Sequence, residues 1–337
     1  MLTRRAMLGV LAGGGALLGG ALPAPAALAG PFGAWTRLSN EPVLGPSGNG
    51  FEGAGVFNPS AVKVDDGIVL IYRAQDAKGT SRLGYAKSSD GIHFERRSAP
   101  VLSPSASYEF AGGVEDPRIV RIGNTYYMTY TGYNSVAETA QLCIATSPDL
   151  LTWERHGVIL PANLGTWNVH WTKSGAIVPE KVNGRWWMYY LGESDELPAG
   201  QMGIAVSDDL LTWKDATPKP ILHTRPRMFD SAVCEPGPAP VVTDDGILLV
   251  YNGANDYLVY STGWALFDKN DPTKLIARSE TPMFGAEKRW ERIGQVPNVV
   301  FVEGMVRDGD RLTLYYGAAD TYIGAAVTTL RLRSSSR

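Results

Sequence analysis

Polar and charged side chains recur at matching positions of five similar segments, and their types suit acid–base chemistry. The positions hold Asn58, Asp116, Lys173 with Ser174, Glu235 and Glu303. Two carboxyl groups, one protonated and one ionised, are the minimum for acid- and base-assisted cleavage of a glycosidic bond. We expect the carboxyls of Asp116 and Glu235 to stand roughly 6.5–9.5 Å apart, a spacing that admits a nucleophilic water and implies inversion. Clustered like charges would raise the pKa of one carboxyl and keep it protonated.

Structural roles compete with these chemical ones. An Asp-Pro pair often caps a turn, so Asp116 could simply pair with Arg118, and His170 could be packing between two tryptophans. Three basic residues could be ion-pair partners of the carboxylates: Arg73, Arg82 and Lys173. A Trp-rich surface beside polar groups also suits stacking on sugar faces. The regular recurrence of the polar positions favours one shared site over separate structural roles.

The chain contains an internal repeat of about sixty residues. Similar four-residue segments begin at Leu83, Leu142, Met202, Thr262 and Ile323, at intervals of 59, 60, 60 and 61 residues. Each repeat offers an inner strand that opens with one of the polar residues, an aromatic strand, the four-residue segment and an outer strand. Four strands per repeat are typical of a propeller blade. The sequence therefore predicts an all-β, five-bladed β-propeller, with a two-domain β-sandwich as the alternative.

The N-terminal part of the mature chain is predicted to complete the last blade. Trp35 and the following Pro-Val-Leu segment match the outer strands of other repeats, yet no blade precedes them. We expect this strand to pair with the last blade, which would remove an exposed edge. The predicted propeller is a single domain over residues 30–333, followed by a tail at 334–337.

Residues 1–29 read as an export signal. Arg4 and Arg5 precede a weakly hydrophobic, Gly-rich stretch, and Ala27-Leu28-Ala29 resembles a cleavage site. The paired arginines favour the twin-arginine route and an extracytoplasmic, periplasmic or secreted location. A retained signal anchor is the alternative. No other segment is apolar for long enough to span a membrane.

Composition restricts the partners and cofactors. The formal net charge is −3, which disfavours nucleic acid or an anionic membrane as a partner. The two cysteines are too few for a disulfide scaffold and are expected to be buried thiols. The four histidines and the carboxylates show no metal-ligand spacing, so the sequence predicts no metal or other cofactor.

Several segments resemble those of glycoside hydrolase family 130. They lie at 57–61, 81–84, 113–118, 172–181, 297–301 and 316–320. The resemblance implies a five-bladed propeller that acts on β-mannosides, as a hydrolase or as a phosphorylase, with a glycan as the partner. It also implies that Asp116 is the general acid. Four further residues are implied to hold the sugar beside the cleaved bond: Asn58, Arg73, Arg82 and Asp320.

The resemblance leaves the acceptor of the sugar open. In the hydrolase branch a pair of glutamates replaces phosphate-binding residues, and Glu193 and Glu235 look like that pair, with Glu235 favoured as the base. In a phosphorylase, three residues could bind phosphate: Arg118, His170 and Lys173. We expect an exo-acting, inverting β-mannosidase. A β-mannoside phosphorylase and a non-catalytic glycan-binding propeller are the alternatives.

Overall fold

The computed structural model describes residues 30–162, 167–193 and 200–332, and the regular secondary structure in these ranges is almost entirely β-strand. The helical elements among them are η1 (Ser107–Glu109) and α1 (Arg289–Arg292). The chain divides into residues 1–30 and 31–337, and all strands belong to the second unit. The predicted export signal at 1–29 and the tail at 334–337 lie outside the described residues, and the predicted domain limits stay a prediction. No helix in the described ranges is long and apolar enough to cross a membrane.

The strands form five groups, each antiparallel within itself. The first two groups are β2 (Gly55–Val64), β3 (Gly67–Gln75), β4 (Ser81–Ser88), β5 (Glu95–Arg96), and β6 (Ala111–Ile122), β7 (Thr125–Asn134), β8 (Thr139–Ser147), β9 (Glu154–Leu160). The third is β10 (Trp171–Ile177), β11 (Trp186–Glu193), β12 (Gln201–Ser207), β13 (Lys214–Asp215).

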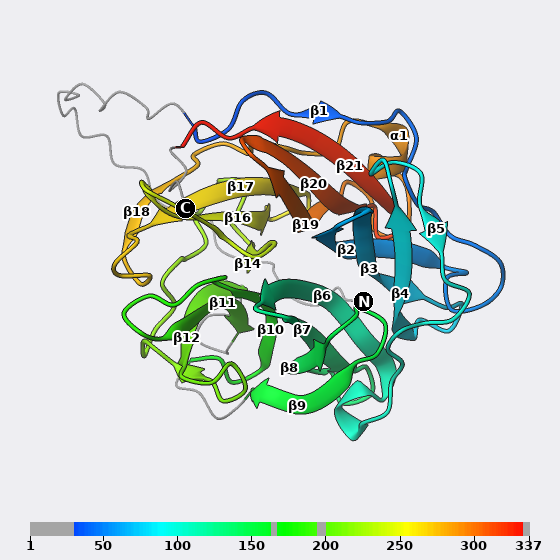
Figure 1. The fold of residues 1–337 in the computed structure, drawn as a ribbon, viewed down its shortest axis with the longest axis horizontal. Coiled ribbons are helices and arrows are strands. Elements are labelled where there is room, and N and C mark those ends of the chain that lie inside the picture. Colours follow the sequence, from blue (N-terminus) through cyan, green and yellow to red (C-terminus); the bar gives the residue numbers. More distant parts are fainter. Residues whose placement is uncertain (1–29, 163–166, 194–199, 333–337) are drawn as a thin grey trace, which may run out of the picture. The chain divides into compact units, whose positions relative to one another are not determined.

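The last two groups complete this pattern with small variations. The fourth group is β14 (Val233–Pro236), β15 (Val241–Thr243), β16 (Gly246–Ala254), β17 (Tyr260–Phe267), β18 (Leu275–Arg278), in which β14 and β15 both pair with β16. The fifth is β19 (Val300–Asp308), β20 (Arg311–Ala318), β21 (Tyr322–Thr329) and β1 (Thr36–Arg37). The five groups surround a common centre, with β2, β6, β10, β14 and β19 innermost (Figure 1).

The all-β prediction is confirmed, and so is the pairing of the N-terminal strand with the last group. In β1, Thr36 lies opposite Val327 of β21 and Arg37 lies opposite Ala326. The Arg37 guanidinium also donates to both carboxylate oxygens of buried Glu291, at 2.7 and 2.8 Å. The beginning of the described chain is therefore held to the last group by backbone and side chain together.

Each of the first four groups meets the next in a similar way, through a short parallel contact between residues at or beside the third strand across its sheet and the first strand of the next group. The contacts pair Ser81 with Gly113, Ala140 with Trp171, Gly200 with Val233, and Tyr260 with Val299. Gly113 has a φ of 106°, and a Cβ there would overlap the Ser81 carbonyl oxygen, so this contact requires glycine. Between the last and first groups, Val56 N–H donates to the Thr321 carbonyl at 3.1 Å.

The repeated turn between the third and fourth strands explains part of the sequence repeat. The Asp149 carboxylate accepts hydrogen bonds from the N–H groups of Leu151 and Thr152, both at 2.8 Å, and the Ser147 hydroxyl accepts one from Leu150. Ser207 with Asp209, and Ser88 with Asp90, make the same bonds in their own turns. Asp and Ser thus stabilise the turn by accepting from backbone N–H groups that have no strand partner.

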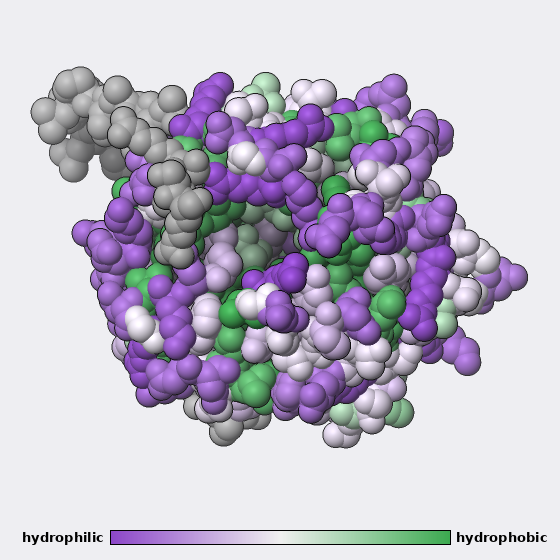
Figure 2. Space-filling model, in the orientation of Figure 1, coloured by the Kyte–Doolittle hydropathy of each residue, from purple (hydrophilic) through white to green (hydrophobic). Residues whose placement is uncertain are grey.

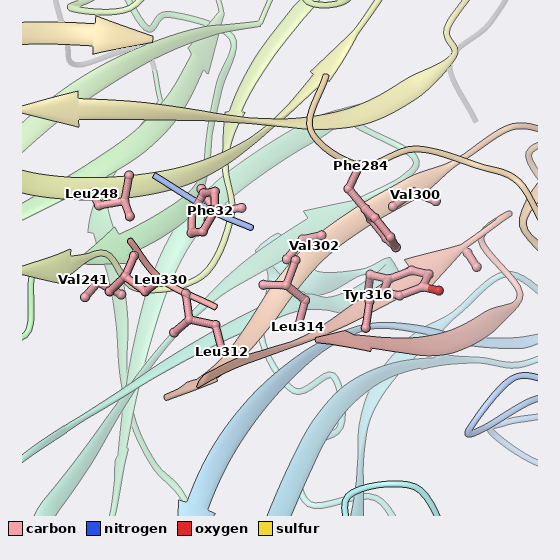
Figure 3. Close-up of a cluster of buried hydrophobic side chains, with 13 residues drawn as sticks. Phe32, Val241, Leu248, Phe284, Val300, Val302, Leu312, Leu314, Tyr316 and Leu330 are labelled. Atoms are coloured by element: carbon pink, nitrogen blue, oxygen red, sulfur yellow. The ribbon is translucent and has the colours of Figure 1, made fainter. Parts of the chain in front are cut away.

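Apolar cores lie between neighbouring groups. The core between the fourth and fifth groups contains Leu248 of β16 together with Val300, Val302 and Leu314 of the last group, and Phe32 from the N-terminal segment lies near Leu248 (Figure 3). Packing of this kind requires large side chains on both faces of each sheet. Both cysteines, Cys143 and Cys234, are free and buried, as expected.

In each group a buried tyrosine donates a hydrogen bond to a carboxylate that connects it to the outer strand. In the first group the Tyr72 hydroxyl donates to Glu52, which also accepts a hydrogen bond from Arg96 of β5 at 3.1 Å. The same tyrosine–carboxylate–arginine arrangement recurs in three other groups, with Tyr130–Glu109–Arg155, Tyr251–Asp230–Arg278 and Tyr316–Glu291–Arg37. In the third group the carboxylate is on the outer strand itself, since Tyr190 donates to Asp215 at 2.5 Å.

Candidate active site

The predicted polar positions lie inside the innermost strands, at irregularities in their pairing. The register shifts at Asn58 in β2, at Asp116 in β6, at Ser174 in β10 and at Glu303 in β19. Asn58, Asp116 and Ser174 have φ values of 48°, 52° and 62°. The sequence placed these residues at the openings of the strands, and this was wrong by three to five residues because the strands begin earlier. Bulges re-aim side chains and are frequent beside active sites.

Two side chains of the first strand group, Asn58 and Arg73, bind the Asp116 carboxylate. Its Oδ1 accepts a hydrogen bond from Asn58 Nδ2 at 3.0 Å and one from Arg73 Nη1 at 3.3 Å. Arg73 Nη2 also donates to Glu115 at 2.6 Å. Burial favours the neutral carboxyl, but the positive charges of Arg73 and Lys173 and the bond from Asn58 outweigh it, so that the pKa of Asp116 is lowered.

Glu115 is a site residue that the sequence analysis missed. Alternation along a regular strand would put Glu115 and Asp116 on opposite faces. The bulge at Asp116 instead brings both carboxyls to the same guanidinium of Arg73, and Ser81 donates to Glu115 at 3.2 Å. Burial raises the pKa of Glu115, and the neighbouring Asp116 charge raises it further.

Glu235 of β14 is buried, with 1% of its surface exposed, and is held by two residues of β10. Its Oε1 accepts a hydrogen bond from the Ser174 hydroxyl and lies 3.3 Å from the Lys173 ammonium. Burial lowers the pKa of Lys173, but Glu235 and Asp116 outweigh burial and raise it. Lys173 thus interacts with both carboxylates that were predicted to form the acid–base pair. The predicted 6.5–9.5 Å between them stays a prediction.

Two further predicted residues, Asp320 and Glu193, belong to the same electrostatic cluster. Burial raises the pKa of Asp320 to about 6, against the opposing effects of Arg73 and Lys173. Burial also raises the pKa of half-buried Glu193, which interacts with Lys173 and with His170. The expected raising of a carboxyl pKa by neighbouring carboxylates is found at Glu115, Asp320 and Glu303, where it adds to burial. The pKa of Glu193 is raised by burial alone, and that of Asp116 moves the other way.

The Arg118 guanidinium is buried and is held by partners within the scaffold. Its side chain is 1% exposed. Its guanidinium donates to the carbonyls of Asp116, Pro236 and Gly237, and Nη2 lies 3.1 Å from the Glu303 carboxyl. These partners engage all three nitrogens of the guanidinium, and the prediction that Arg118 binds sugar or phosphate stays a prediction.

Arg82 and His170 lie at the margin of the cluster. The Arg82 guanidinium donates to Asp76 at 2.8 Å. His170 is exposed, and its backbone N–H donates to the Glu193 carbonyl at 2.9 Å, which places it next to that carboxylic residue. The predicted contacts of Arg82 and His170 with a sugar or phosphate stay predictions.

Tyr260 at the start of β17 is a second residue that the sequence analysis missed. Burial raises the pKa of its phenol, and the charges of Glu235 and Asp320 raise it further, so Tyr260 belongs to the same electrostatic cluster. The first residue of a third strand carries no acidic or basic motif, so its type gave no signal. In the ranges that the structure describes, no group of three or more His, Cys, Asp or Glu side chains is placed to hold a metal ion.

The cluster joins residues from all five strand groups at their innermost strands or at adjoining strand ends. The visible face is hollowed near its middle, where β6, β14 and β19 converge (Figures 1 and 2). The all-β scaffold gathers buried acids, a lysine and an arginine at its centre, a set of groups suited to acid- and base-assisted cleavage of a glycosidic bond.

Comparison with known proteins identifies the family. The chain belongs to glycoside hydrolase family 130, whose model, described as β-1,4-mannooligosaccharide phosphorylase, matches residues 35–332. The resemblance predicted from the sequence is thereby confirmed.

Similar proteins of this family include phosphorylases and a structure linked to hydrolases. The chain is 42% identical to a 1,2-β-oligomannan phosphorylase of Thermoanaerobacter sp. (strain X514), covering 88% of this chain and 97% of the relative. It is 38% identical to a β-1,2-mannobiose phosphorylase of the same organism, over 87% and 96%. A solved structure matches with a TM-score of 0.81 and 34% identity, over 93% and 98%, and its description states that this family of mannoside phosphorylases contains glycoside hydrolases that target β-1,2 mannosidic linkages in Candida mannan.

Proposed function

We propose that this chain is an exo-acting enzyme that cleaves the terminal mannosyl residue of β-linked manno-oligosaccharides with inversion, using Asp116 as the general acid. The observation that carries the proposal is the gathering of Asp116, Glu235 and Lys173 at one centre in a member of this family. Its neighbours lower the pKa of Asp116, so its carboxyl must gain a proton on substrate binding to act as an acid. A neutral sugar that displaces water would favour the protonated carboxyl that an acid catalyst needs.

Inorganic phosphate is the acceptor that the named relatives support. The two relatives from Thermoanaerobacter are phosphorylases of β-1,2-linked mannosides, and they match 88% and 87% of this chain. They favour the phosphorylase alternative over the hydrolase predicted from the sequence. In this form of the proposal, Lys173 supplies positive charge to phosphate, and Asp116 protonates the leaving sugar.

Water is the second candidate, because the charges of the site favour it. Arg73 is engaged by Glu115 and Asp116, and Lys173 lies 3.3 Å from Glu235. An ionised Glu235 about 4 Å from a phosphate would repel each unit of its charge by about 4 kcal/mol at an effective dielectric near 20. In a hydrolase, Glu235 or Glu193 would instead activate the attacking water.

Product analysis separates these possibilities. The purified protein is incubated with β-1,2- and β-1,4-linked mannobiose and mannotriose, with and without inorganic phosphate, and the products are identified by NMR. A phosphorylase yields α-mannose 1-phosphate and needs phosphate, whereas a hydrolase yields α-mannose in its absence. Products of β configuration would exclude inversion. Binding of these sugars without turnover under either condition would favour the glycan-binding alternative.

We also propose that the five strand groups are the blades of one closed propeller. The support is the recurrent contact between the third strand of one group and the first strand of the next, together with the Val56–Thr321 hydrogen bond between the last group and the first. An experimental structure with a different number of groups around the centre would refute this arrangement.

We propose, from the sequence of residues 1–29 alone, that the protein is exported by the twin-arginine route. Replacement of Arg4 and Arg5 by lysine should abolish export of a fused reporter. Unchanged export of the lysine variant would refute the proposal.

A further inference from the structure

Arg118 links three of the innermost strands through a single buried guanidinium. It belongs to β6, and its Nη1 donates to the Asp116 carbonyl of the same strand at 3.2 Å. Across the centre it reaches the strand group that begins with β14, where Nη2 donates to the Pro236 carbonyl at 2.8 Å and Nε donates to the Gly237 carbonyl at 2.9 Å. The neighbouring β19 contributes Glu303, whose carboxyl is 3.1 Å from Nη2.

These contacts fix the backbone at both carboxylates of the proposed reaction. Asp116 itself supplies one carbonyl, and Pro236 directly follows Glu235. The guanidinium is planar and rigid, so carbonyls bonded to its different nitrogens are held at a set separation. The side chains are oriented separately, Asp116 by Asn58 and Arg73, and Glu235 by residues of β10.

We infer that Arg118 is a positioning residue, which sets the distance between the Asp116 and Glu235 carboxyls across the centre of the site. The effect of Arg118 on the rate of cleavage rests on the function proposed above, whereas its effect on the distance between the two carboxyls does not. Glu303 lies 3.1 Å from this guanidinium, and the positive charge of Arg118 opposes the burial that raises the pKa of the Glu303 carboxyl.

The role depends on the shape of the guanidinium more than on its charge. Lysine would keep the positive charge, but its ammonium is a compact point charge, so it cannot span carbonyls of two strand groups in one plane. The chain offers a matched control in Arg37, whose buried guanidinium also bonds a carboxylate and a backbone carbonyl, those of Glu291 and Gly285, but in the outer strand of the fifth group.

The test compares Arg118→Lys with Arg37→Lys in steady-state kinetics and in crystal structures. A misplacement near 1 Å costs about 100-fold in rate, so we expect Arg118→Lys to lower kcat by about that factor while KM changes little. Arg37→Lys should lower the unfolding temperature but leave kcat unchanged. The crystal structure of Arg118→Lys should show a changed separation between the Asp116 and Glu235 carboxyls.

A kcat for Arg118→Lys close to that of the unmodified protein, or an unchanged carboxyl separation, would overturn the inference. Glu303→Gln provides a second test if Arg118→Lys does not fold, because it replaces the acid beside the guanidinium and leaves the three carbonyl bonds in place. It should retain the carboxyl separation seen in the unmodified protein, and a shifted separation would also overturn the inference. If the unmodified protein cleaves no mannoside, the proposed function fails while the two separations still test the positioning role.

Discussion

Replacement of Asp320 by asparagine should stabilise the protein near neutral pH while impairing the site. Asp320 follows β20, lies in the charged cluster and has a φ of 50°, a conformation that asparagine also tolerates. Asparagine resembles the protonated carboxyl in size and carries no charge. The substitution therefore removes the cost of ionising a buried acid and little else.

The magnitude follows from the shift in pKa. Burial raises the pKa of Asp320 from 3.8 to about 6 in the folded state. One pKa unit corresponds to about 1.4 kcal/mol, so ionisation of Asp320 above pH 6 destabilises the folded chain by about 3 kcal/mol. The pKa of Asp320 is higher in the folded than in the unfolded chain, so the full destabilisation is present above the folded-state pKa of about 6. It disappears as the pH falls below the unfolded value.

Urea unfolding of both proteins at several pH values between 4 and 7.5 measures this effect. The asparagine variant should be more stable by about 3 kcal/mol at pH 7.5, and the difference should shrink to below about 1 kcal/mol at pH 4. Equal stability at pH 7.5, or a difference that does not change with pH, would refute the reasoning. The variant should also bind β-mannosides less tightly if Asp320 holds the sugar as proposed.

Other substitutions test the site and the scaffold. Asp116→Asn should lower turnover by about 10²–10⁴-fold while sugar binding is largely kept, which initial rates and calorimetry can measure; loss of binding with unchanged turnover of the bound fraction would contradict its role as the acid. Arg37→Ala leaves the buried Glu291 without its cation and should cost about 3–5 kcal/mol in unfolding free energy, whereas a loss below 1 kcal/mol would show that the N-terminal strand is not fastened by this pair. Lys173→Met removes a charge that lowers the pKa of Asp116, so an NMR titration should find that pKa raised, and a fall would contradict the assigned cluster.

The repeat allowed much of the fold to be predicted. Polar residues such as Asp116 and Glu235 were identified because equivalent positions recur at regular intervals, and the structure brings both close to Lys173. The N-terminal strand was assigned to the last group by the same reasoning, and Thr36 indeed pairs with Val327. Periodicity thus carries information about which residues share a place in the repeat.

Periodicity could not show the local backbone, and the errors lie there. Glu115 was missed because strict alternation turns its side chain away from Asp116, and only a bulge brings the two together. The buried contacts of Arg118 were not predicted because its partners at Pro236 and Gly237 are backbone carbonyls, which any residue type provides. Contacts of this kind leave no trace in the sequence of either partner.

The irregular positions in the innermost strands have a consequence for how such a site changes. At Asn58, Asp116 and Glu303 the ladder resumes its regular pairing on both sides of the irregularity. A new side chain at one of these positions would alter the lining of the centre while the flanking hydrogen bonds keep the strand in register. Exchange of acceptor or sugar within one family would then need few substitutions, and a library confined to these positions could sample new chemistry on an unaltered scaffold.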